Sequence, residues 1–250
     1  MRIFDATMHK NIKPFQDQSS SKKEQVTQMF DHIAKNYDGL NRIMTLRIDQ
    51  LWRKRVVKQV EQEKPQIILD IATGTADLAI ALHKTTAKEI IGLDIAPQML
   101  AVGQKKIDKK KLNQKIKLQL GDSENLPFKS NTFDIVTVAF GVRNFENLDL
   151  GLQEVYRVLK PRGKAIILET AVPKNKLLRW GYHWYTQNFL PFIGKRFAKD
   201  RTAYRYLSDS AAAFPCGAAF NNILEKNGFI MVEDNPQTLG VASIYCAFKP

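Results

Sequence analysis

The sequence predicts an α/β protein with a mostly parallel β-sheet and helices on both of its faces. Short apolar runs alternate with segments of helical periodicity, the first run turns directly into a helix, and the first two runs each end in an aspartate. Strands are expected at 66–71, 90–95, 115–120, 133–139 and 164–170, and helices at 75–84, 97–108 and 147–159. Such alternation is typical of a parallel sheet with helical crossovers. Two last runs, Phe229–Glu233 and Val241–Phe248, predict an antiparallel hairpin at the edge of the sheet.

The chain before the sheet is expected to form a tail and two helices. Residues 1–23 have little hydrophobic pattern and are predicted to be a mobile tail. Apolar residues from 26 to 37 recur at the spacing of one helix face, and Asp38-Gly39 is expected to end that helix. A second helical stripe runs from 48 to 60. We expect the N-terminal helices (24–62) to cover one edge of the sheet and to roof a ligand site.

The turn after the first strand predicts a small-molecule site. Asp70 closes a short apolar run, and a small-residue turn that contains Gly74 and Thr75 leads into the next helix. Ligands of open α/β sheets bind outside the carboxyl ends of the strands, and Gly74 would let a ligand approach the backbone closely. The turn lacks the G-x-G-x-x-G pattern of dinucleotide-binding folds. An ordinary turn without a ligand is the alternative interpretation.

Acidic residues also follow the second and third strands. Asp94 closes the second strand, where a carboxylate suits ribose hydroxyls. Asp122 and Ser123 follow the third strand, where a carboxylate can accept from an exocyclic amine and a backbone N–H can donate to a ring nitrogen. These positions therefore predict contacts to a nucleoside. A helix N-cap is the alternative role for Asp122 or Ser123.

Composition and charge narrow the class of protein. The 250 residues are 44% hydrophobic and 25% charged, as in a globular protein. No apolar run reaches the ~18 residues of a membrane span, and Met1–Phe15 lacks the apolar core of a secretory signal, so we expect a cytoplasmic protein. The histidines His9, His32, His83 and His183 have no metal-ligand spacing, so no metal is expected. The net charge of +13 favours an anionic partner.

The segment 172–214 interrupts the alternation and is predicted to be an aromatic and basic lid. It holds ten of the chain's aromatic residues, and eight Lys or Arg against the single acid Asp200 lie between Lys174 and Arg205. Such a mixture suits an anionic lipid interface or stacking on single-stranded nucleic acid. A cover over a greasy substrate is the third interpretation. We expect residues 24–250 to form one domain that includes this lid.

The acids after the first three strands resemble those of class I S-adenosylmethionine-dependent methyltransferases. More specific motifs are similar to the ubiquinone/menaquinone biosynthesis C-methyltransferase family, from about residue 24 to the end. They are Phe30–Asp38 (FDHIAKNYD), Leu51–Arg53 (LWR), Ala139–Phe145 (AFGVRNF), Glu154–Pro161 (EVYRVLKP), Ala203–Leu207 (AYRYL) and the Phe248–Pro250 terminus. The F-G-x-R-N element is the most specific of them. The resemblance implies a Rossmann-like class I methyltransferase fold with a seven-stranded sheet.

The resemblance also implies an activity. It implies S-adenosylmethionine as co-substrate and methylation of a ring carbon of a prenylated quinol. Demethylmenaquinol is the first choice of substrate, and 2-methoxy-6-polyprenyl-benzoquinol is the alternative. The implied cofactor contacts are Thr75, Asp94, Asp122 and Ser123. Two departures from the family stand at Thr73–Asp77, where members often have Gly-Gly-Thr-Gly-Asp, and at Ala139, where members often have Ser.

The chemistry of a quinol ring selects the candidate catalytic residues. A hydroquinone carbon is a poor nucleophile until an adjacent hydroxyl ionises, and phenols titrate near 10, so the site must stabilise a phenolate or take its proton. Arg143 can hold the oxyanion, Asn144 can donate beside it, and Tyr37 can orient the ring or relay a proton. An ion pair at the surface is the alternative for Arg143, and a core aromatic for Tyr37. His183 is a weaker candidate base.

Two other functions stay open at this point. An RNA methyltransferase is favoured by the pI near 9.7 and by the basic aromatic segment. A non-catalytic quinone- or lipid-binding protein is the other. Because a prenyl tail stays in the bilayer, we expect peripheral contact with the anionic inner face of the membrane through residues 174–206, with Lys195, Arg196 and Lys199 contributing. No nucleic-acid partner is expected, and the oligomeric state is left open.

Overall fold

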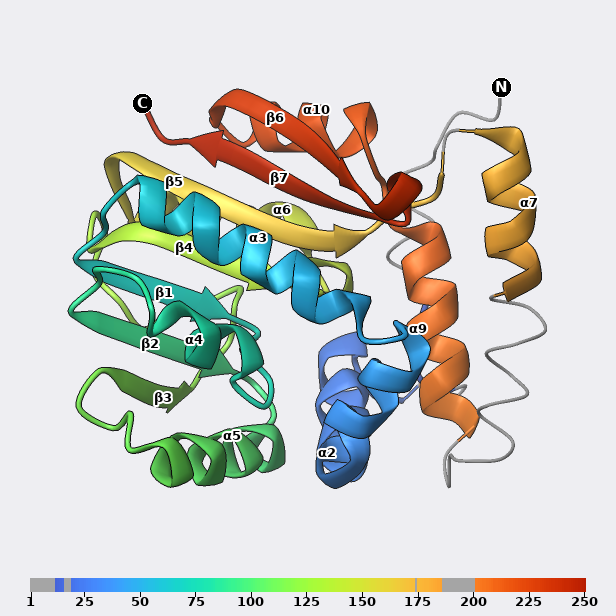
Figure 1. Cartoon of the computed structure of the whole chain (residues 1–250), viewed down its shortest axis with the longest axis horizontal. Helices are drawn as coiled ribbons and strands as arrows, with labels where there is room; N and C mark the ends of the chain where they lie inside the picture. Colours follow the sequence, from blue (N-terminus) through green and yellow to red (C-terminus); the bar gives the residue numbers. More distant parts are fainter. Residues whose placement is uncertain (1–11, 16–18, 174, 186–200) are drawn as a thin grey trace.

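The computed structural model describes residues 12–15, 19–173, 175–185 and 201–250 (Figure 1). They contain a seven-stranded sheet in the order β3-β2-β1-β4-β5-β7-β6. Its strands are β1 (Ile67–Ile71), β2 (Glu89–Asp94), β3 (Ile116–Leu120), β4 (Phe133–Ala139), β5 (Leu159–Thr170), β6 (Ile230–Gln237) and β7 (Ala242–Phe248). β7 runs antiparallel to β5 and β6, and the other neighbours are parallel. The predicted fold class is therefore confirmed, including the antiparallel pair at one edge.

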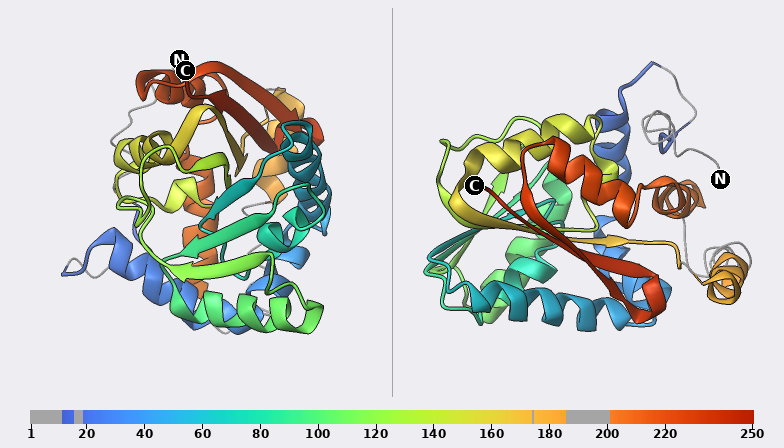
Figure 2. Two further views of the ribbon diagram at one scale, coloured as in Figure 1. Left: turned by 90° about the vertical axis from the view of Figure 1, so that its left-hand side faces the viewer. Right: turned by 90° about the horizontal axis from the view of Figure 1, so that it is seen from above.

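Helices cover both faces of the sheet (Figure 2). The strands are buried on both sides, so neighbouring residues of one strand enter different cores. Ile68 packs with α3 (Ile48–Gln62), α4 (Asp77–Leu82) and α5 (Pro97–Lys110). Leu69 faces the other way and packs with α6 (Leu148–Val158) and α10 (Ala218–Lys226). This arrangement leaves the carboxyl ends of the parallel strands as the open side of the sheet.

The first helix is longer than the sequence predicts. α2 spans Lys22–Met44 and begins with a capping box, in which Ser21 and Glu24 bond each other's backbone N–H groups. It therefore starts two residues inside the expected tail. It also continues through Asp38-Gly39, where we expected its end. Helix interiors tolerate a glycine at a cost of about 1 kcal/mol, and the Asp38 side chain accepts hydrogen bonds from neighbouring elements.

β5 begins earlier than the expected strand at 164–170, because residues 159–163 also belong to it. The strand follows α6 directly, and Leu159 pairs with Phe133 before the register shifts at Lys164. Gly163 is needed there because a Cβ atom at this position would lie 2.8 Å from the carbonyl oxygen of Lys160. The Pro-Arg-Gly sequence therefore forms an irregularity within the strand.

The expected lid is helical where the structure describes it. α7 spans Lys176–Trp184 and α9 spans Arg201–Ala213, while residues 186–200 lie outside the described part. Ala203 and Tyr206 of α9 pack against α2 in a small separate core. β5 in Figure 1 points toward the side of the molecule on which α2, α7 and α9 lie. Among the described residues, no helix is long and apolar enough to cross a membrane.

Candidate active site

A cavity of about 80 Å³, with several charged residues in its lining, opens at the carboxyl ends of the parallel strands. We call it the cofactor cavity. It is lined by residues of the β1, β2, β3 and β4 ends and of α2, among them Gly74, Asp94, Asp122, Ser123, Tyr37, Ala139 and Asn144. Gly74 has φ +56°, a backbone conformation that favours glycine. The structure thus brings together four of the six predicted cofactor residues with two of the three predicted catalytic ones.

Asp94 is buried at the centre of this cavity and fixes its shape. Its Oδ2 accepts from the Gly74 N–H at 2.7 Å and its Oδ1 from the Ala96 N–H at 2.9 Å. Burial raises the pKa of Asp94 to about 6, although these backbone N–H groups oppose the shift. Each carboxylate oxygen retains a second lone pair for a ligand. Asp94 can therefore hold the turn after β1 and accept from ribose hydroxyls at once.

Asp122 and Ser123 lie at the β3 end of the cavity. Asp122 forms an ion pair with Lys23 of α2, with 2.6 Å between Nζ and Oδ2, and Lys23 also lies 3.3 Å from Glu124. The Asp122 Oδ1 accepts from the Glu124 backbone N–H. Lys23 therefore connects the first turn of α2 to the residues that were predicted to contact a nucleoside.

Two predicted cofactor residues lie outside the lining of this cavity. Asp70 is buried below the turn, where it accepts from the Thr73 and Thr137 hydroxyls at 2.6 and 2.7 Å. Burial raises its pKa to about 6. The Thr75 hydroxyl donates to Asp38 and lies 3.2 Å from Lys106 Nζ. Asp70 thus supports the turn from below, and Thr75 ties the turn to α2.

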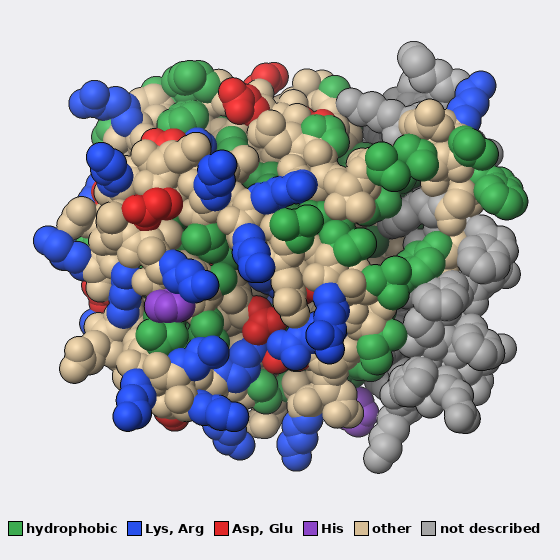
Figure 3. All heavy atoms as spheres, in the orientation of Figure 1, with side chains coloured by type: hydrophobic (Ala, Val, Ile, Leu, Met, Phe, Trp, Pro, Cys, Tyr) green, Lys and Arg blue, Asp and Glu red, His purple; other side chains and the backbone are tan. Residues whose placement is uncertain are grey.

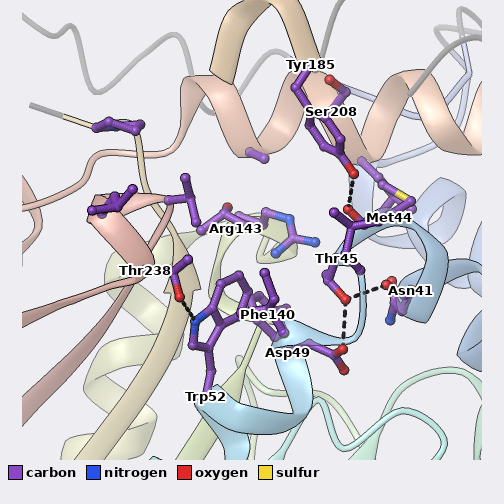
Figure 4. A pocket seen from close by; sticks show the side chains of 18 of the residues that line it. Asn41, Met44, Thr45, Asp49, Trp52, Phe140, Arg143, Tyr185, Ser208 and Thr238 are labelled. Carbon is purple, nitrogen blue, oxygen red and sulfur yellow. Dashed lines mark hydrogen bonds between the residues drawn. The ribbon is translucent and has the colours of Figure 1, made fainter. Parts of the chain in front are cut away.

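A second, mostly apolar cavity of about 370 Å³ adjoins the first. We call it the substrate cavity. Its walls come from α2, α3, α7, α9, β5 and the η3 turn (Thr238–Gly240), and Figure 4 shows many of the side chains. The apolar lining includes Met44, Leu46, Ile48, Trp52, Phe140, Leu178, Leu207, Leu239 and Val241. The sequence did not predict this cavity. Three of its residues nevertheless belong to predicted features: Trp52 and Arg53 to the Leu51–Arg53 motif, and Tyr37 to the helix face over 26–37.

Tyr37 and Phe140 line both cavities and form the wall between them. Phe140 follows β4 with φ +59°, a strained backbone for a residue with a side chain. The guanidinium carbons of Arg53 and Arg143 lie 5.6 and 5.9 Å from its ring centroid, which is within the range of cation–π attraction. Tyr37 is partly buried, and burial raises the pKa of its hydroxyl.

Arg143 is buried and reaches the substrate cavity from the short 3-10 helix η1 (Val142–Asn144). Its Nη1 donates to Glu169 at 2.5 Å, and Glu169 is fully buried at the end of β5. Burial alone would lower the pKa of Arg143, but the Glu169 carboxylate raises it. In the described part of the chain, Arg143 Nε and Glu169 Oε2 have no hydrogen-bond partner. The ion pair is therefore buried, in place of the surface pair considered as an alternative.

Asn144 occupies the base of the wall between the cavities. Its Nδ2 donates to the Phe140 carbonyl at 3.3 Å, and its Oδ1 accepts from the Tyr206 hydroxyl at 3.1 Å. It therefore joins the Phe140 loop to α9. The backbone after it is held by Lys22, whose ammonium donates to the carbonyls of Arg143 and Phe145. Burial lowers the pKa of Lys22 to about 8.

The comparisons with known proteins agree with this geometry. Residues 18–249 match the model of the ubiE/COQ5 methyltransferase family. The chain belongs to this family. A demethylmenaquinone methyltransferase from Bacteroides fragilis is 42% identical over 239 residues, covering 95% of this chain and 97% of that protein. A ubiquinone/menaquinone biosynthesis C-methyltransferase UbiE from Geotalea daltonii is 38% identical over 232 residues, covering 92% and 98%.

Solved structures confirm the class I methyltransferase fold. A candidate S-adenosylmethionine-dependent methyltransferase from Methanococcus maripaludis superposes with a TM-score of 0.62 at 22% identity, covering 88% of this chain and 94% of that one. Phosphoethanolamine N-methyltransferase 2 from Haemonchus contortus, solved with S-adenosyl-L-methionine, gives 0.53 at 18% identity, covering 74% and 49%. Membership of the methyltransferase family confirms the predicted resemblance. Among the described residues, no group of three or more His, Cys, Asp or Glu is placed to hold a metal ion.

Proposed function

We propose that this chain transfers a methyl group from S-adenosylmethionine to a ring carbon of demethylmenaquinol. The observation that carries the proposal is the pair of adjoining cavities, one lined by several carboxylates and one mostly apolar, with only Tyr37 and Phe140 common to both. A methyl donor in the first and a greasy aromatic acceptor in the second would meet at this wall. The names of the relatives support the same reaction, since they describe methylation of demethylmenaquinone.

The residues of the cofactor cavity fit S-adenosylmethionine. Asp94 offers buried carboxylate oxygens to ribose hydroxyls, and Asp122 offers an acceptor to an adenine amine. Gly74 belongs to the lining and has no side chain, so a ligand can approach its backbone closely. The cavity is also acidic, because Glu124 and Glu146 join these aspartates in its lining. Bound S-adenosylmethionine supplies an electrophilic methyl on a cationic sulfur, and the acidic lining favours that charge.

Arg143 is proposed to stabilise the phenolate that develops on the quinol. A guanidinium stays charged throughout, and in Figure 4 the Arg143 guanidinium points into the substrate cavity, where its N–H groups can donate to an oxyanion. Glu169 holds the other side of the guanidinium. Tyr37 is proposed to orient the ring beside the methyl donor, and Asn144 to position the Phe140 loop. Correct alignment of two bound reactants is itself a large part of such catalysis.

Methylation of an isolated substrate tests this proposal. Purified protein, S-adenosylmethionine and chemically reduced demethylmenaquinol should give menaquinol, identified in the mass spectrum by the gain of one CH₂ unit on the ring. The name of the Geotalea daltonii relative also points to a ubiquinone precursor, so 2-methoxy-6-polyprenyl-benzoquinol is the second substrate to assay. Total RNA from the host serves as the third. Product from RNA alone would overturn the proposal.

The finer proposal is peripheral contact with an anionic membrane, because a prenyl tail stays in the bilayer. Four exposed apolar side chains support it. On α7, Leu177 is 75% exposed and Trp180 is 69% exposed. In the lining of the substrate cavity, Leu46 is 63% exposed and Leu239 is 71% exposed. Figure 3 shows hydrophobic side chains gathered toward the α7 and α9 side of the molecule, with Lys and Arg spread over the neighbouring face. Lys195, Arg196 and Lys199 lie outside the described residues.

Co-sedimentation with liposomes measures this contact. Binding to vesicles that contain anionic lipid should weaken as salt rises, because the basic charge is screened. Replacing Leu177 and Trp180 by Ser should reduce binding, while Met231→Ser, which removes an equally exposed apolar side chain on β6, serves as the control. Equal binding of all variants to neutral and anionic vesicles would contradict the contact.

A further inference from the structure

We infer that Asp49 is the proton acceptor of the substrate cavity, an inference that rests on the proposed quinol methylation. Asp49 is the second residue of α3, and it is only 3% exposed. Among the described residues that line the substrate cavity, it is the only carboxylate. In Figure 4 its carboxyl group lies beside Thr45, on the same pocket into which the Arg143 guanidinium points. The cavity thus combines a group that can take a proton with one that can hold the resulting oxyanion.

The hydrogen bonds around Asp49 accommodate either protonation state. The Thr45 hydroxyl lies 2.7 Å from Asp49 Oδ1 and 2.7 Å from the Asn41 carbonyl oxygen. A hydroxyl has one proton and can donate it fully to one acceptor only. When that proton goes to Asn41, Asp49 Oδ1 can bond Thr45 by donating a proton of its own. Gaining a proton therefore costs Asp49 no hydrogen bond at Oδ1.

The second oxygen of Asp49 is held by a cation that also belongs to the cavity. Arg53, one turn further along α3, pairs with Asp49 Oδ2 and lies over the Phe140 ring. Arg143 approaches the same ring from its own element. The partner of Arg143, Glu169, is not part of the cavity lining. Of the two buried carboxylates paired with these arginines, only Asp49 therefore belongs to the cavity lining.

The other titratable side chains of this cavity do not compete as bases near neutral pH. Burial raises the pKa of both the Tyr37 and the Tyr185 hydroxyl, so both keep their protons. Arg53 and Arg143 remain charged. The side chain of His183, the weaker candidate base, lies outside the described part of the structure. Asp49 is thus the group of this lining that accepts a proton from a neutral quinol.

The proposed methyl transfer begins with the loss of the hydroxyl proton of the quinol. Asp49 takes the hydroxyl proton of the quinol, and Arg143 stabilises the phenolate oxygen. The oxygen lone pair shifts into the ring, the adjacent ring carbon forms a bond to the methyl carbon, and the sulfur–methyl bond breaks with its electron pair left on sulfur. The hydrogen on the methylated carbon then leaves as a proton, and its bond electrons restore the aromatic ring. The ring oxygen regains a proton, so one proton in total is released to solvent.

The test compares Asp49→Asn and Asp49→Glu in the full chain with S-adenosylmethionine and reduced demethylmenaquinol. The asparagine is isosteric but cannot accept the proton, so kcat at pH 7 should fall at least about 100-fold, with unchanged affinity for S-adenosylhomocysteine. The deficit should shrink as pH rises toward 10, where the quinol ionises unaided. The glutamate variant should retain a larger share of kcat than the asparagine variant.

Matched variants separate a base from a structural residue. Glu63 is another ion-paired carboxylate, which follows α3 directly and pairs with Lys164 outside the cavity lining. Glu63→Gln should therefore leave kcat unchanged. Thr45→Val removes the neighbour of Asp49 but keeps the carboxylate. Two results would overturn the inference if the wild type turns over the quinol. One is a kcat of Asp49→Asn within threefold of the wild-type kcat. The other is a loss of kcat in Asp49→Asn that is the same at every pH and is matched by the loss in Thr45→Val. Absence of wild-type turnover on any quinol would instead overturn the proposed function, and the inference with it.

Discussion

The cofactor cavity and the substrate cavity are built from different parts of the fold. The first lies at strand ends whose positions follow from the register of the parallel sheet, such as the pairing of Asp70 with Gly92 and of Asp94 with Leu120. The second is enclosed mainly by helices and by the η3 turn. Sheet registry fixes a few polar atoms accurately, which suits a ligand of constant shape. Packed helices enclose a larger apolar volume, which suits a ring with a long hydrocarbon tail.

The two cavities also differ in how their charges are matched. The cofactor lining contains four carboxylates, Asp94, Asp122, Glu124 and Glu146, against the single cation Lys23 among the residues described. In the substrate cavity each arginine has a carboxylate partner, Asp49 for Arg53 and Glu169 for Arg143. The first cavity therefore favours a cationic ligand. The second is balanced for a neutral quinol and becomes favourable for an anion once Asp49 holds a proton.

The largest expected effect comes from breaking the Arg143–Glu169 pair. Arg143→Met should lower turnover by about 10²–10³-fold, because the developing oxyanion loses its donor, while affinity for S-adenosylhomocysteine stays unchanged. It should also reduce the free energy of unfolding by about 3–5 kcal/mol, because fully buried Glu169 keeps a charge without a partner. Urea unfolding and steady-state kinetics measure the two effects separately.

The double variant Arg143→Met/Glu169→Leu sharpens this result. Replacing both members of a buried ion pair by apolar residues is often close to neutral for stability, so the unfolding free energy should recover. Turnover should not recover, since the donor is still missing. If turnover returned with stability, Arg143 would serve the fold and not the chemistry, and the assignment of the substrate cavity would lose its oxyanion site.

The contrast between the cavities explains how far sequence reasoning reached. Asp94, Asp122, Ser123 and Gly74 line one cavity because the ends of parallel strands must meet at one edge. The substrate cavity depends on crossing angles between helices, which side-chain packing sets and local periodicity does not encode. Asp49 carried no local signal, because an acid in the first turn of a helix is ordinary. Its bond to Thr45 and its place in the same cavity lining as Arg143 give it significance.

Thr75 illustrates the same limit within a well-predicted motif. The turn lies where it was predicted, and the resemblance implied a cofactor contact for Thr75, but this residue lies outside the lining of the cofactor cavity. In the structure the Thr75 hydroxyl is engaged by Asp38 of α2, a residue that the sequence suggested as a helix end. The extension of α2 to Met44 creates this bond. An error of one helix boundary thus changes the environment of a residue far away in the chain.

An effect of intermediate size is expected at Asp94. Asp94→Asn should weaken binding of S-adenosylmethionine by about 1–3 kcal/mol, because buried ribose hydroxyls lose an ionised acceptor. The pKa of Asp94 is raised to about 6, so wild-type affinity should fall as pH drops from 7.5 to 5, and the affinity of Asp94→Asn should depend less on pH. Calorimetry at several pH values measures this, with Asp70→Asn as the control for the other buried aspartate.

The same carboxyl makes an opposite contribution to stability. In the folded state its pKa is about 6, above the ordinary value of 3.8 for an aspartate, so between these values the folded chain binds more protons than the unfolded chain. The free energy of unfolding contributed by Asp94 therefore decreases as pH rises from about 4 to 6. The asparagine variant should lack that part of the decrease. Ligand affinity and stability would thus respond to pH in opposite directions at one residue.

The smallest expected effect is at Lys23, where α2 closes over the cofactor cavity. About 80 Å³ is small for a ligand pocket, which usually measures some 300–1,000 Å³, so we expect the first turn of α2 to move outward when a ligand enters. Lys23 links that turn to Asp122, but its side chain is 30% exposed. An ion pair of this kind contributes less than about 1 kcal/mol.

Lys23→Ala should therefore raise the association rate of S-adenosylmethionine a few-fold in stopped-flow fluorescence, whereas Lys35→Ala, at an exposed position of the same helix, should not. High salt should bring the wild type toward the variant, because it screens the Lys23–Asp122 pair. A slower association in Lys23→Ala would mean that Lys23 attracts the ligand and does not hold the helix closed.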